Sequence, residues 1–352
     1  MQKEIKMPSR TISKWYYSPL TLRYLEIPFK VYSIYLRQVG YDLKSMITPF
    51  RKKDIGLEIN SFNIIPTTFC NSRCVFCAHK FLKDKKETMD FSIAKKAIDE
   101  FALLGGKEVS LTPMVGEALI DPGIFRKIEY AKKKGLRVSL YTNAIALGNK
   151  GIIEQILKAE IDELQIDIAD INPKYESEVF GIPIKTARRT INSIIELSEQ
   201  IDKKKINQKF ILGFRSSRHF SEIWKEFKDS KFMEYYKKGI FTIEYLHAYD
   251  NWGGQIKEKD LKGVQRLRKC ARIKKFPCGA LWSLSILPNG DVRLCGCRFK
   301  GTIKDELVIG NIKKDSLSKL LKSKKWKNII QNFESKSPEV CKECSFYTPK
   351  FN

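Results

Sequence analysis

Short apolar runs alternate with helix-like stretches between residues 62 and 250, and this alternation constrains the fold more than any other feature of the sequence. The runs have the length of buried strands in a parallel sheet: Asn63–Thr67, Glu108–Thr112, Arg137–Tyr141, Glu163–Ile168, Lys209–Phe214 and Phe241–Leu246. Apolar residues recur at helical spacing in the stretches between them: Phe91–Leu103, Gly123–Lys134, Gly151–Lys158, Ile184–Ile201 and Phe220–Lys237. The sequence therefore predicts an α/β fold, a barrel or a doubly wound sheet, with its chemistry at the carboxyl ends of the strands.

Length and cysteine content limit the function classes. The chain has 352 residues, of which 43% are hydrophobic, so it can bury a core and is not a disordered chain. No run approaches the roughly 18 apolar residues of a membrane span, and Met1–Lys6 lacks the apolar stretch of a signal peptide. We therefore expect a cytoplasmic protein whose nine cysteines serve metal binding or catalysis rather than disulfides.

The net charge of +25, from 65 Lys and Arg against 40 Asp and Glu, has two interpretations. One is an anionic partner such as nucleic acid, a membrane surface, a phosphorylated substrate or an acidic protein. The other is a bias in base composition, because Lys, Ile and Asn are abundant throughout the chain. The basic residues form no compact Arg–aromatic motif. We prefer the second interpretation and expect no nucleic-acid partner.

Two segments flank the alternating region, so we divide the chain into residues 1–60, 61–250 and 251–352. In the first, Tyr16–Arg37 interleaves aromatic, aliphatic and basic residues, which predicts one or two amphipathic helices. We expect this helical extension to pack against the central domain, and contact with an anionic membrane surface is the less favoured alternative. In the last, Asn289-Gly290 between two apolar runs predicts a hairpin, and Asp315–Phe333 predicts a basic helix.

Three cysteines directly follow the first predicted strand: Cys70, Cys74 and Cys77. At spacings of four and three, their thiolates can converge from one loop, and soft sulfur ligands in this number suit an iron–sulfur cluster or zinc. A zinc site would need a fourth ligand, for which His79 is nearby. On a four-iron cluster, three cysteines would instead leave one iron open to a substrate or cofactor.

This CxxxCxxC run, with Phe76 before the last cysteine, resembles the signature of the radical S-adenosylmethionine (SAM) superfamily. The resemblance implies a partial (β/α)6 barrel of TIM type and a [4Fe–4S] cluster on the three cysteines. It also implies that the amino and carboxylate groups of SAM chelate the open iron, and that Phe76 packs near the adenine. Reduction would then cleave SAM to a 5′-deoxyadenosyl radical, which abstracts hydrogen from a substrate.

A second segment of the chain matches the same family. Pro113–Leu119 ends the second predicted strand and resembles the GGEP-type segment that contacts the SAM amine. Gly116 and Glu117 remain, and they supply a backbone contact and a carboxylate for the ammonium group. Val115 and Ala118 depart from the motif, which puts the rest of that contact in doubt.

The ends of later strands supply further matches. Thr142 and Asn143, after the third predicted strand, are similar to the family's TN motif near SAM. The usual serine–aspartate pair is absent after the fourth strand, where Asp167 is assigned to the ribose and Asp170 stands close by. Arg215 ends the fifth strand and is assigned to the SAM carboxylate. Each of these matches is weak evidence by itself, but their order after the cysteine loop makes the set specific for the family.

The C-terminal region holds six of the nine cysteines. The pattern C-x11-G-x4-C, followed by a CxxC pair, resembles a SPASM domain, an auxiliary-cluster module of radical SAM enzymes. The chain ends eight residues after that pair without another cysteine, so it resembles the truncated twitch type, which holds one auxiliary [4Fe–4S] cluster. The implied ligands are Cys278, Cys295, Cys341 and Cys344, with Cys270 and Cys297 as spares. A zinc ribbon is the alternative that this two-plus-two grouping allows.

A four-cysteine auxiliary cluster can accept an electron from a substrate radical, whereas a hydrogen-returning cysteine would lead to epimerisation. The leading hypothesis is therefore a radical SAM oxidoreductase, dehydrogenase-like, that acts on a small polar substrate such as a sugar or an aminocyclitol. The first alternative is a peptide-modifying SPASM maturase that cross-links, epimerises or performs sulfatase-type maturation. A zinc-binding module for nucleic acid is the remote alternative.

Candidate catalytic residues follow the sixth predicted strand. His247 is a candidate base for a substrate radical, and Asp250 is a candidate substrate contact. A single histidine in such a place is more often a packed side chain. Cleavage of SAM also needs a low-potential electron donor. Ferredoxin or flavodoxin is expected, since such donors are typically acidic and the basic surface would attract them.

Overall fold

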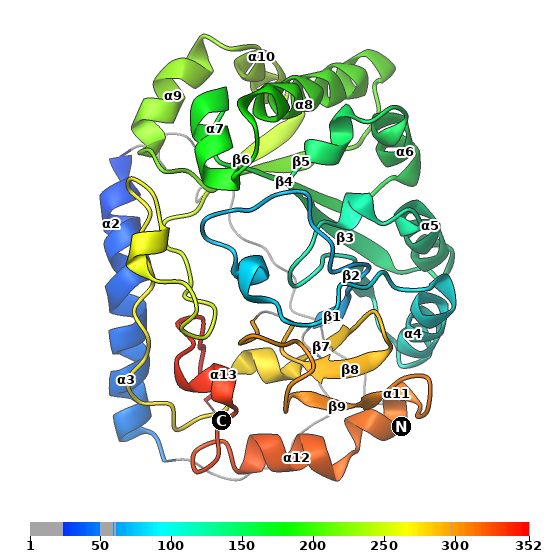
Figure 1. The fold of residues 1–352 in the computed structure, drawn as a ribbon, viewed down its shortest axis with the longest axis vertical. Helices are drawn as coiled ribbons and strands as arrows, with labels where there is room; N and C mark the ends of the chain where they lie inside the picture. The colour runs from blue at the N-terminus through cyan, green and yellow to red at the C-terminus, as the bar shows by residue number, and fades with distance from the viewer. Residues whose placement is uncertain (1–23, 50–58, 60, 297, 352) are drawn as a thin grey trace.

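The computed structural model describes residues 24–49, 59, 61–296 and 298–351 (Figure 1). Its centre is a nine-stranded sheet with the order β6-β5-β4-β3-β2-β1-β7-β8-β9. Strands β1 to β6 pair in parallel and span Ser61–Ile64, Glu108–Ser110, Arg137–Thr142, Glu163–Ile168, Phe210–Phe214 and Phe241–Tyr245. Strands β2 to β6 lie where the apolar runs predict them, whereas β1 begins and ends earlier than the predicted run Asn63–Thr67. The array of six parallel strands confirms the α/β class and the barrel-like arrangement.

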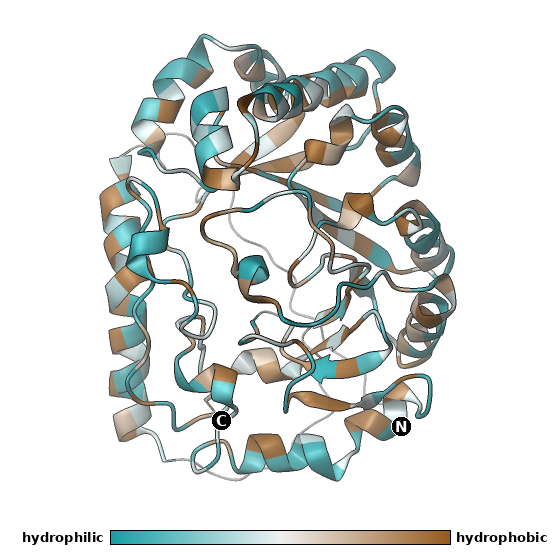
Figure 2. Cartoon of the chain, viewed as in Figure 1, coloured by the Kyte–Doolittle hydropathy of each residue, from teal (hydrophilic) through white to brown (hydrophobic). Residues whose placement is uncertain are grey.

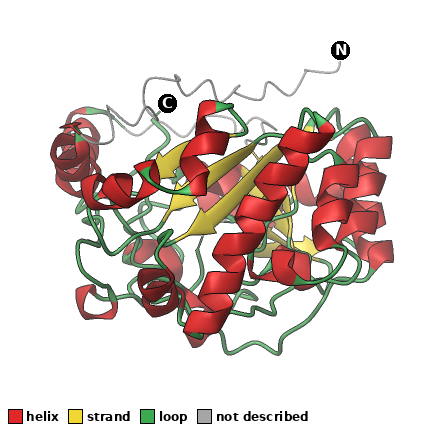
Figure 3. Cartoon of the chain, turned by 90° about the horizontal axis from the view of Figure 1, so that it is seen from above, coloured by secondary structure: helices red, strands yellow, loops and turns green. Residues whose placement is uncertain are grey.

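Helices connect the parallel strands and lie around the sheet (Figure 3). Their bounds are Phe91–Leu103 (α4), Ile124–Lys133 (α5), Ile152–Ala159 (α6), Pro173–Phe180 (α7), Ile184–Lys204 (α8), Phe220–Lys228 (α9) and Lys231–Lys237 (α10). The predicted helix at Phe220–Lys237 divides at Ser230, which has extended backbone and donates its hydroxyl to the carbonyl of Phe227 (2.7 Å). A serine that bonds its own backbone in this way competes with continuation of the helix.

The C-terminal region extends the same sheet. Strand β7 (Ser283–Ile286) pairs in parallel with β1 over four residue pairs, and β8 (Asp291–Leu294) and β9 (Val308–Asn311) continue the sheet in antiparallel register. The turn between β7 and β8 places Gly290 at a φ of +91°, which confirms the predicted hairpin. One hydrophobic core therefore runs without interruption from Phe62 of β1 to Trp326 of the C-terminal region.

The remaining helices lie at the ends of the chain. The predicted helix at Asp315–Phe333 is two helices, α11 (Leu317–Leu321) and α12 (Lys324–Gln331), because Ser323 caps the second one by accepting from the Trp326 amide (3.3 Å). Helix α13 spans Glu339–Lys342. Helix α2 (Glu26–Val31), the π-helical turn Tyr32–Leu36 and α3 (Arg37–Ile47) follow one another along one side of the molecule (Figure 1). Among the described residues, no helix combines the length and apolar character that crossing a membrane requires.

Truncation of the chain after Lys275 is expected to abolish cooperative unfolding of the barrel. Strand β1 would lose β7, and Phe62 and Ile64, each at most 1% exposed, would face water. Each such side chain contributes about 1.5–3 kcal/mol when buried, a large share of a total stability of about 5–15 kcal/mol. Thermal unfolding followed by circular dichroism measures this. A fragment that melts cooperatively near the full-length midpoint would show that the barrel folds without β7.

Candidate functional site

A cavity of about 770 Å³ opens at the carboxyl ends of strands β1 to β4, where a parallel α/β fold places its chemistry. It brings together nine of the side chains predicted from the sequence: Cys70, Cys74, Cys77, Phe76, Gly116, Glu117, Thr142, Asn143 and Asp167. Trp252 also lines it and comes from the segment after β6. The predicted residues Arg215, His247 and Asp250 are not among the side chains that form its wall.

The cysteine loop presents three partly buried thiols to this cavity. The hydroxyl oxygen of Ser72 lies 3.3 Å from the sulfur atoms of both Cys70 and Cys74. Burial raises the pKa of Cys70, and it raises the pKa of Cys77 to about 12. These groups are thus neutral thiols unless a cation stabilises their thiolates, and a metal cluster supplies that charge. The donor set therefore fits an iron–sulfur cluster, which Cys70, Cys74 and Cys77 would hold at the cavity wall.

Helix α7 holds the cysteine loop in place, and this helix was not predicted from the sequence. The amides of Arg73 and Val75 donate to the carbonyls of Phe180 and Val179, at 2.9 Å each. The signals for the helix are present in Asn172-Pro173 at its start and Gly181 after its end. The Asn172 side chain accepts from the Lys174 amide, Pro173 occupies the first helical position, and Gly181 has a φ of +61°.

Glu117 joins the predicted SAM-contacting segments through its buried carboxylate. Its Oε1 accepts from the Thr142 hydroxyl (2.7 Å) and the Leu119 amide (3.1 Å), and its Oε2 accepts from the Asn143 amide (2.9 Å). Burial raises the pKa of Glu117, and these hydrogen bonds oppose the shift. Among the described residues, Oε2 has one donor for its two lone pairs, so it can accept another from a ligand in the cavity.

Asn143 ties the end of β3 to the cysteine loop. Its side-chain nitrogen donates to Asn71 Oδ1 (2.8 Å) and to the Ser72 hydroxyl (3.3 Å). Ser72 in turn contacts the cysteine sulfur atoms, so a chain of polar contacts runs from Glu117 to the thiols. Sequence patterns gave no indication of the part played by Asn71 and Ser72, since their contacts are made across the cavity.

Asp167 lines the cavity, whereas Arg215 and Asp170 form ion pairs within the protein. The Arg215 guanidinium donates to Asp167 (3.0 Å) and lies 3.6 Å from Glu244, so Arg215 reaches the cavity only through Asp167. Asp170 is fully buried and accepts two hydrogen bonds from Arg218, at 2.7 and 2.8 Å. Asp170 is therefore committed to a structural ion pair.

The two candidate catalytic residues lie away from the cavity wall. His247 packs between Phe29 and Tyr245, with ring centres 5.5 and 5.3 Å away, and neither ring nitrogen has a hydrogen-bond partner among the described residues. Burial lowers the pKa of His247 to about 4. Asp250 instead forms an ion pair with Arg298. His247 is therefore a packed side chain and Asp250 the ion-pair partner of Arg298, and we assign neither a direct role in catalysis.

The C-terminal cysteines gather at a second, small cavity. Its wall contains all four predicted auxiliary ligands: Cys278, Cys295, Cys341 and Cys344. Burial raises the pKa of Cys278 to about 11 and that of Cys344 to about 12, so these thiols also fit a metal cluster. Cys270 is not part of this wall and donates to the Glu343 carbonyl (3.1 Å), whereas Cys297 lies outside the described residues.

A buried cation lies beside these thiols and was not singled out from the sequence. Arg293 of β8 is fully buried, pairs with Asp305 (2.6 Å) and donates to the carbonyl of Arg298 (2.9 Å). Its guanidinium also donates to the carbonyls of Leu294 and Cys295. A paired arginine in this position holds the loop that carries Cys295 and adds positive charge near the sulfur atoms.

Arg298 links the two cavities. Its guanidinium carbon lies 4.3 Å from the ring centre of Trp252, which lines the first cavity, and 4.5 Å from that of Phe346, which lines the second. The indole nitrogen of Trp252 donates to the carbonyl of Phe76 in the cysteine loop (2.9 Å). Asp250 balances the charge of Arg298. Arg298 thus contacts one aromatic side chain from the wall of each cavity, and Trp252 also bonds to the cysteine loop.

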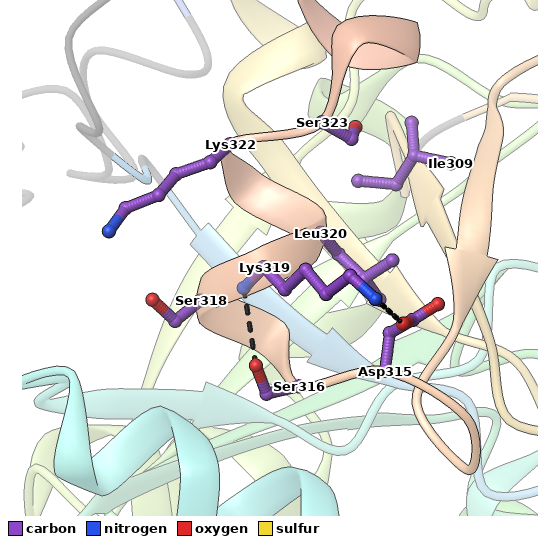
Figure 4. Close-up of a pocket in the computed structure, with 8 residues that line it drawn as sticks. All are labelled: Ile309, Asp315, Ser316, Ser318, Lys319, Leu320, Lys322 and Ser323. Carbon is purple, nitrogen blue, oxygen red and sulfur yellow. Dashed lines mark hydrogen bonds and ion pairs between the residues drawn. The ribbon is translucent and has the colours of Figure 1, made fainter.

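A further surface hollow lies over helix α11 (Figure 4). There Ser316 accepts from the Lys319 amide (3.3 Å), and the Lys319 ammonium pairs with Asp315 (2.6 Å). These polar side chains bond to one another, and no predicted site residue lines the hollow. We assign no ligand to it.

Gly116→Ala is expected to destabilise the first cavity by about 1–3 kcal/mol. Gly116 has a φ of +138°, and a Cβ there would lie 2.5 Å from the Thr67 carbonyl oxygen and 3.0 Å from that of Phe69. Gly105→Ala is the matched control, because Gly105 also has a positive φ (+79°) but has open space around it. Thermal midpoints and SAM binding of the two variants measure the difference. Equal losses would show that the two carbonyls do not restrict position 116.

Comparison with known proteins covers both regions that hold the cysteines. The profile of the Radical SAM superfamily matches residues 64–215, and that of SPASM, an iron–sulfur cluster-binding domain, matches residues 278–345. A GTP 3′,8-cyclase of Clostridium perfringens (strain SM101 / Type A) is 28% identical over 193 residues, which are 52% of this chain and 57% of that protein. A probable GTP 3′,8-cyclase of Methanococcus vannielii is 25% identical over 148 residues, 42% of this chain and 48% of that protein. The chain thus spans about half the length of the curated relatives it matches.

Solved structures share the fold. Streptococcus suis SuiB bound to precursor peptide SuiA has a TM-score of 0.55 and 16% identity, over 89% of this chain and 75% of that chain. Native anSMEcpe with bound AdoMet has a TM-score of 0.50 and 15% identity, over 81% of this chain and 86% of that chain. The chain thus carries a Radical SAM domain at residues 64–215 and a C-terminal SPASM domain at residues 278–345, which together imply a SAM-binding [4Fe–4S] cluster, an auxiliary iron–sulfur cluster and SAM as its cofactors.

Proposed function

We propose that this protein is a radical SAM oxidoreductase that oxidises a small polar substrate, such as a sugar or an aminocyclitol, with the auxiliary cluster as electron acceptor. The observation that carries the proposal is the contact of Arg298 with one aromatic ring from each cavity wall. Loss of a hydrogen atom, then of one electron and one proton, oxidises a substrate by two electrons. A nearby electron acceptor favours that outcome over return of the hydrogen.

The chain's residues in the first cavity have distinct roles in this proposal. Cys70, Cys74 and Cys77 hold the SAM-binding cluster, and the free lone pair of Glu117 Oε2 receives the SAM ammonium group. Asp167, oriented by Arg215, faces the ribose. When bound, the reduced cluster and SAM supply the radical that takes hydrogen from the substrate. The apolar side chains Phe76 and Trp252 keep bulk water from that radical.

In the second cavity, the proposal assigns the auxiliary cluster to Cys278, Cys295, Cys341 and Cys344. Arg293 and Arg298 lie near these cysteines, and their guanidinium groups offset the carboxylates of Asp305 and Asp250, so among the described residues these carboxylates do not oppose the extra negative charge of a reduced cluster. The arrangement is therefore compatible with electron acceptance. Ferredoxin or flavodoxin is the proposed external donor, and the net charge of +25 would attract such acidic partners.

The curated relatives support a small polar substrate. They are named for acting on GTP, a small polar molecule. The solved structures under 25% identical share only the fold, so a peptide bound to one of them does not favour a peptide substrate here. The proposal of a small polar substrate is therefore based on the curated relatives.

Iron analysis and SAM cleavage test the two assignments. After anaerobic reconstitution we expect about eight irons per chain, and about four in Cys70/Cys74/Cys77→Ala, which should release no 5′-deoxyadenosine with dithionite and SAM. Cys341/Cys344→Ala is the matched control: it should also keep about four irons yet still cleave SAM. Four irons per chain in the wild-type protein would contradict the assignment of an auxiliary cluster and therefore the proposed oxidising role. No iron would overturn the assignment of both cysteine groups.

Arg298→Gln is expected to lower the reduction potential of the auxiliary cluster. Removal of the guanidinium leaves the Asp250 carboxylate unbalanced near Cys344 and disfavours electron uptake. We expect a shift of tens of millivolts, since about 1.4 kcal/mol corresponds to about 59 mV for one electron. Redox titration in the Cys70/Cys74/Cys77→Ala background reads the auxiliary cluster alone, with Arg137→Gln, an exposed arginine, as control. An unchanged potential would show that Arg298 does not act on this cluster.

A further inference from the structure

Residues 24–47, called here the N-terminal helix, comprise α2, the π-helical turn and α3 with the two residues before them. Polar side chains of this segment face the protein and apolar side chains face outward, the opposite of a usual surface helix. The Glu26 carboxylate accepts from the Phe220 amide (2.9 Å), and Gln38 donates to the Ser345 carbonyl (3.1 Å). Asp42 accepts from the Ile273 amide (2.8 Å). Glu26 and Gln38 are each at most 4% exposed. The helix thus packs on the body of the protein, as expected from the sequence, but through its polar side.

The opposite side of the N-terminal helix is apolar and exposed. Of the fourteen large hydrophobic side chains that the structure leaves exposed among its described residues, eleven belong to this helix: Tyr24, Leu25, Ile27, Val31, Tyr32, Tyr35, Leu36, Val39, Leu43, Met46 and Ile47. Lys44 is the one charged residue exposed within residues 24–47. Hydrophobic residues recur along the whole helix (Figure 2). A continuous apolar face of this kind marks an interaction surface rather than scattered exposure.

A basic segment accompanies the helix along its length. Residues 262–275 contain seven Lys and Arg and no Asp or Glu. The segment contacts the helix through Lys30 and the Val264 carbonyl, through the Lys269 amide and the Ile34 carbonyl (2.9 Å), and through Lys275 and the Thr48 carbonyl (3.2 Å). Its exposed basic side chains are Lys262, Arg266, Lys269 and Arg272.

We propose that the apolar face of the N-terminal helix and this basic segment dock the protein on an anionic lipid bilayer. The helical residues 26–47 extend over about 33 Å, and the leucine, isoleucine and tyrosine side chains of the N-terminal helix suit insertion at the boundary between headgroups and acyl chains. The basic side chains at its flank are attracted by anionic headgroups. A partner that fits both the apolar face and the basic segment must offer an apolar layer bordered by negative charge, as an anionic bilayer does.

Charge distinguishes the bilayer from a second copy of this chain. A dimer through the same helix would bring two segments of seven basic residues toward each other, in molecules that each carry a net charge of +25. Like charges held close together oppose such an association. An anionic bilayer instead neutralises the basic segment while it covers the apolar face, so the observations favour the lipid surface.

Vesicle binding of the full chain tests the proposal. We expect co-sedimentation with phosphatidylcholine/phosphatidylglycerol vesicles, with affinity about tenfold or more above that for phosphatidylcholine alone. Val39→Glu/Leu43→Glu should lose about tenfold or more of this binding, since both side chains are more than half exposed and their replacement leaves the core intact. Arg266→Gln/Lys269→Gln should remove the preference for the anionic lipid. Leu103→Glu, at an 84% exposed leucine on α4, is the matched control and should bind as the wild type does.

Other outcomes overturn the proposal. Failure of the full chain to bind either vesicle would exclude the bilayer, as would equal binding by Val39→Glu/Leu43→Glu and wild type. A dimer that dissociates in Val39→Glu/Leu43→Glu, without vesicle binding, would assign the face to a second copy. Binding that appears only after removal of residues 1–23 would assign the face to that segment. Unchanged thermal midpoints and iron content of all variants show that binding, not folding, is being measured.

Discussion

Parallel pairing of β1 with β7 determines the geometry of both cysteine groups. The pairing joins residues more than 200 positions apart, and Asn63 reinforces it by donating to the Leu284 carbonyl (3.1 Å). The cysteine loop leaves the carboxyl end of β1, while the hairpin that starts with β7 leads to Cys295. A Cβ at Gly296 would lie 2.3 Å from the Ser285 hydroxyl, so the chain beside Cys295 approaches β7 as closely as glycine permits. Both metal sites therefore depend on this single strand contact.

Buried charges near the two cavities are each held by a specific partner. Glu117 is compensated by three hydrogen-bond donors, Arg293 by Asp305, and Asp170 by Arg218. Removing a charge from water costs several kcal/mol unless such partners replace the solvent. The same penalty would apply to thiolates in either cavity, which is why burial raises the pKa of Cys70 and Cys278. The partners that make burial of these charges possible therefore stabilise the fold and also position the residues around the two cavities.

The N-terminal helix connects regions that are distant in sequence. Glu26 binds the start of α9, and Gln38 binds the chain just after Cys344, so the helix spans from the barrel to the auxiliary region (Figure 1). Use of its polar residues for these internal contacts leaves its apolar residues outside. The surface proposed to meet the bilayer thus follows from how the helix fastens the two regions.

Local patterns in the amino-acid sequence were enough to place the six parallel strands, most of the helices and the hairpin, because periodicity and turn residues are local signals. The spacing of Cys70, Cys74 and Cys77 likewise placed three thiols on one loop. Only the folded chain shows that β7 joins β1, that Arg298 lies between two aromatic rings, and that His247 is separated from the cavity. The fold also selects which side of the N-terminal helix faces outward. These are contacts between distant segments, and no local pattern encodes them, since they depend on which surfaces remain to be covered once the sheet has formed.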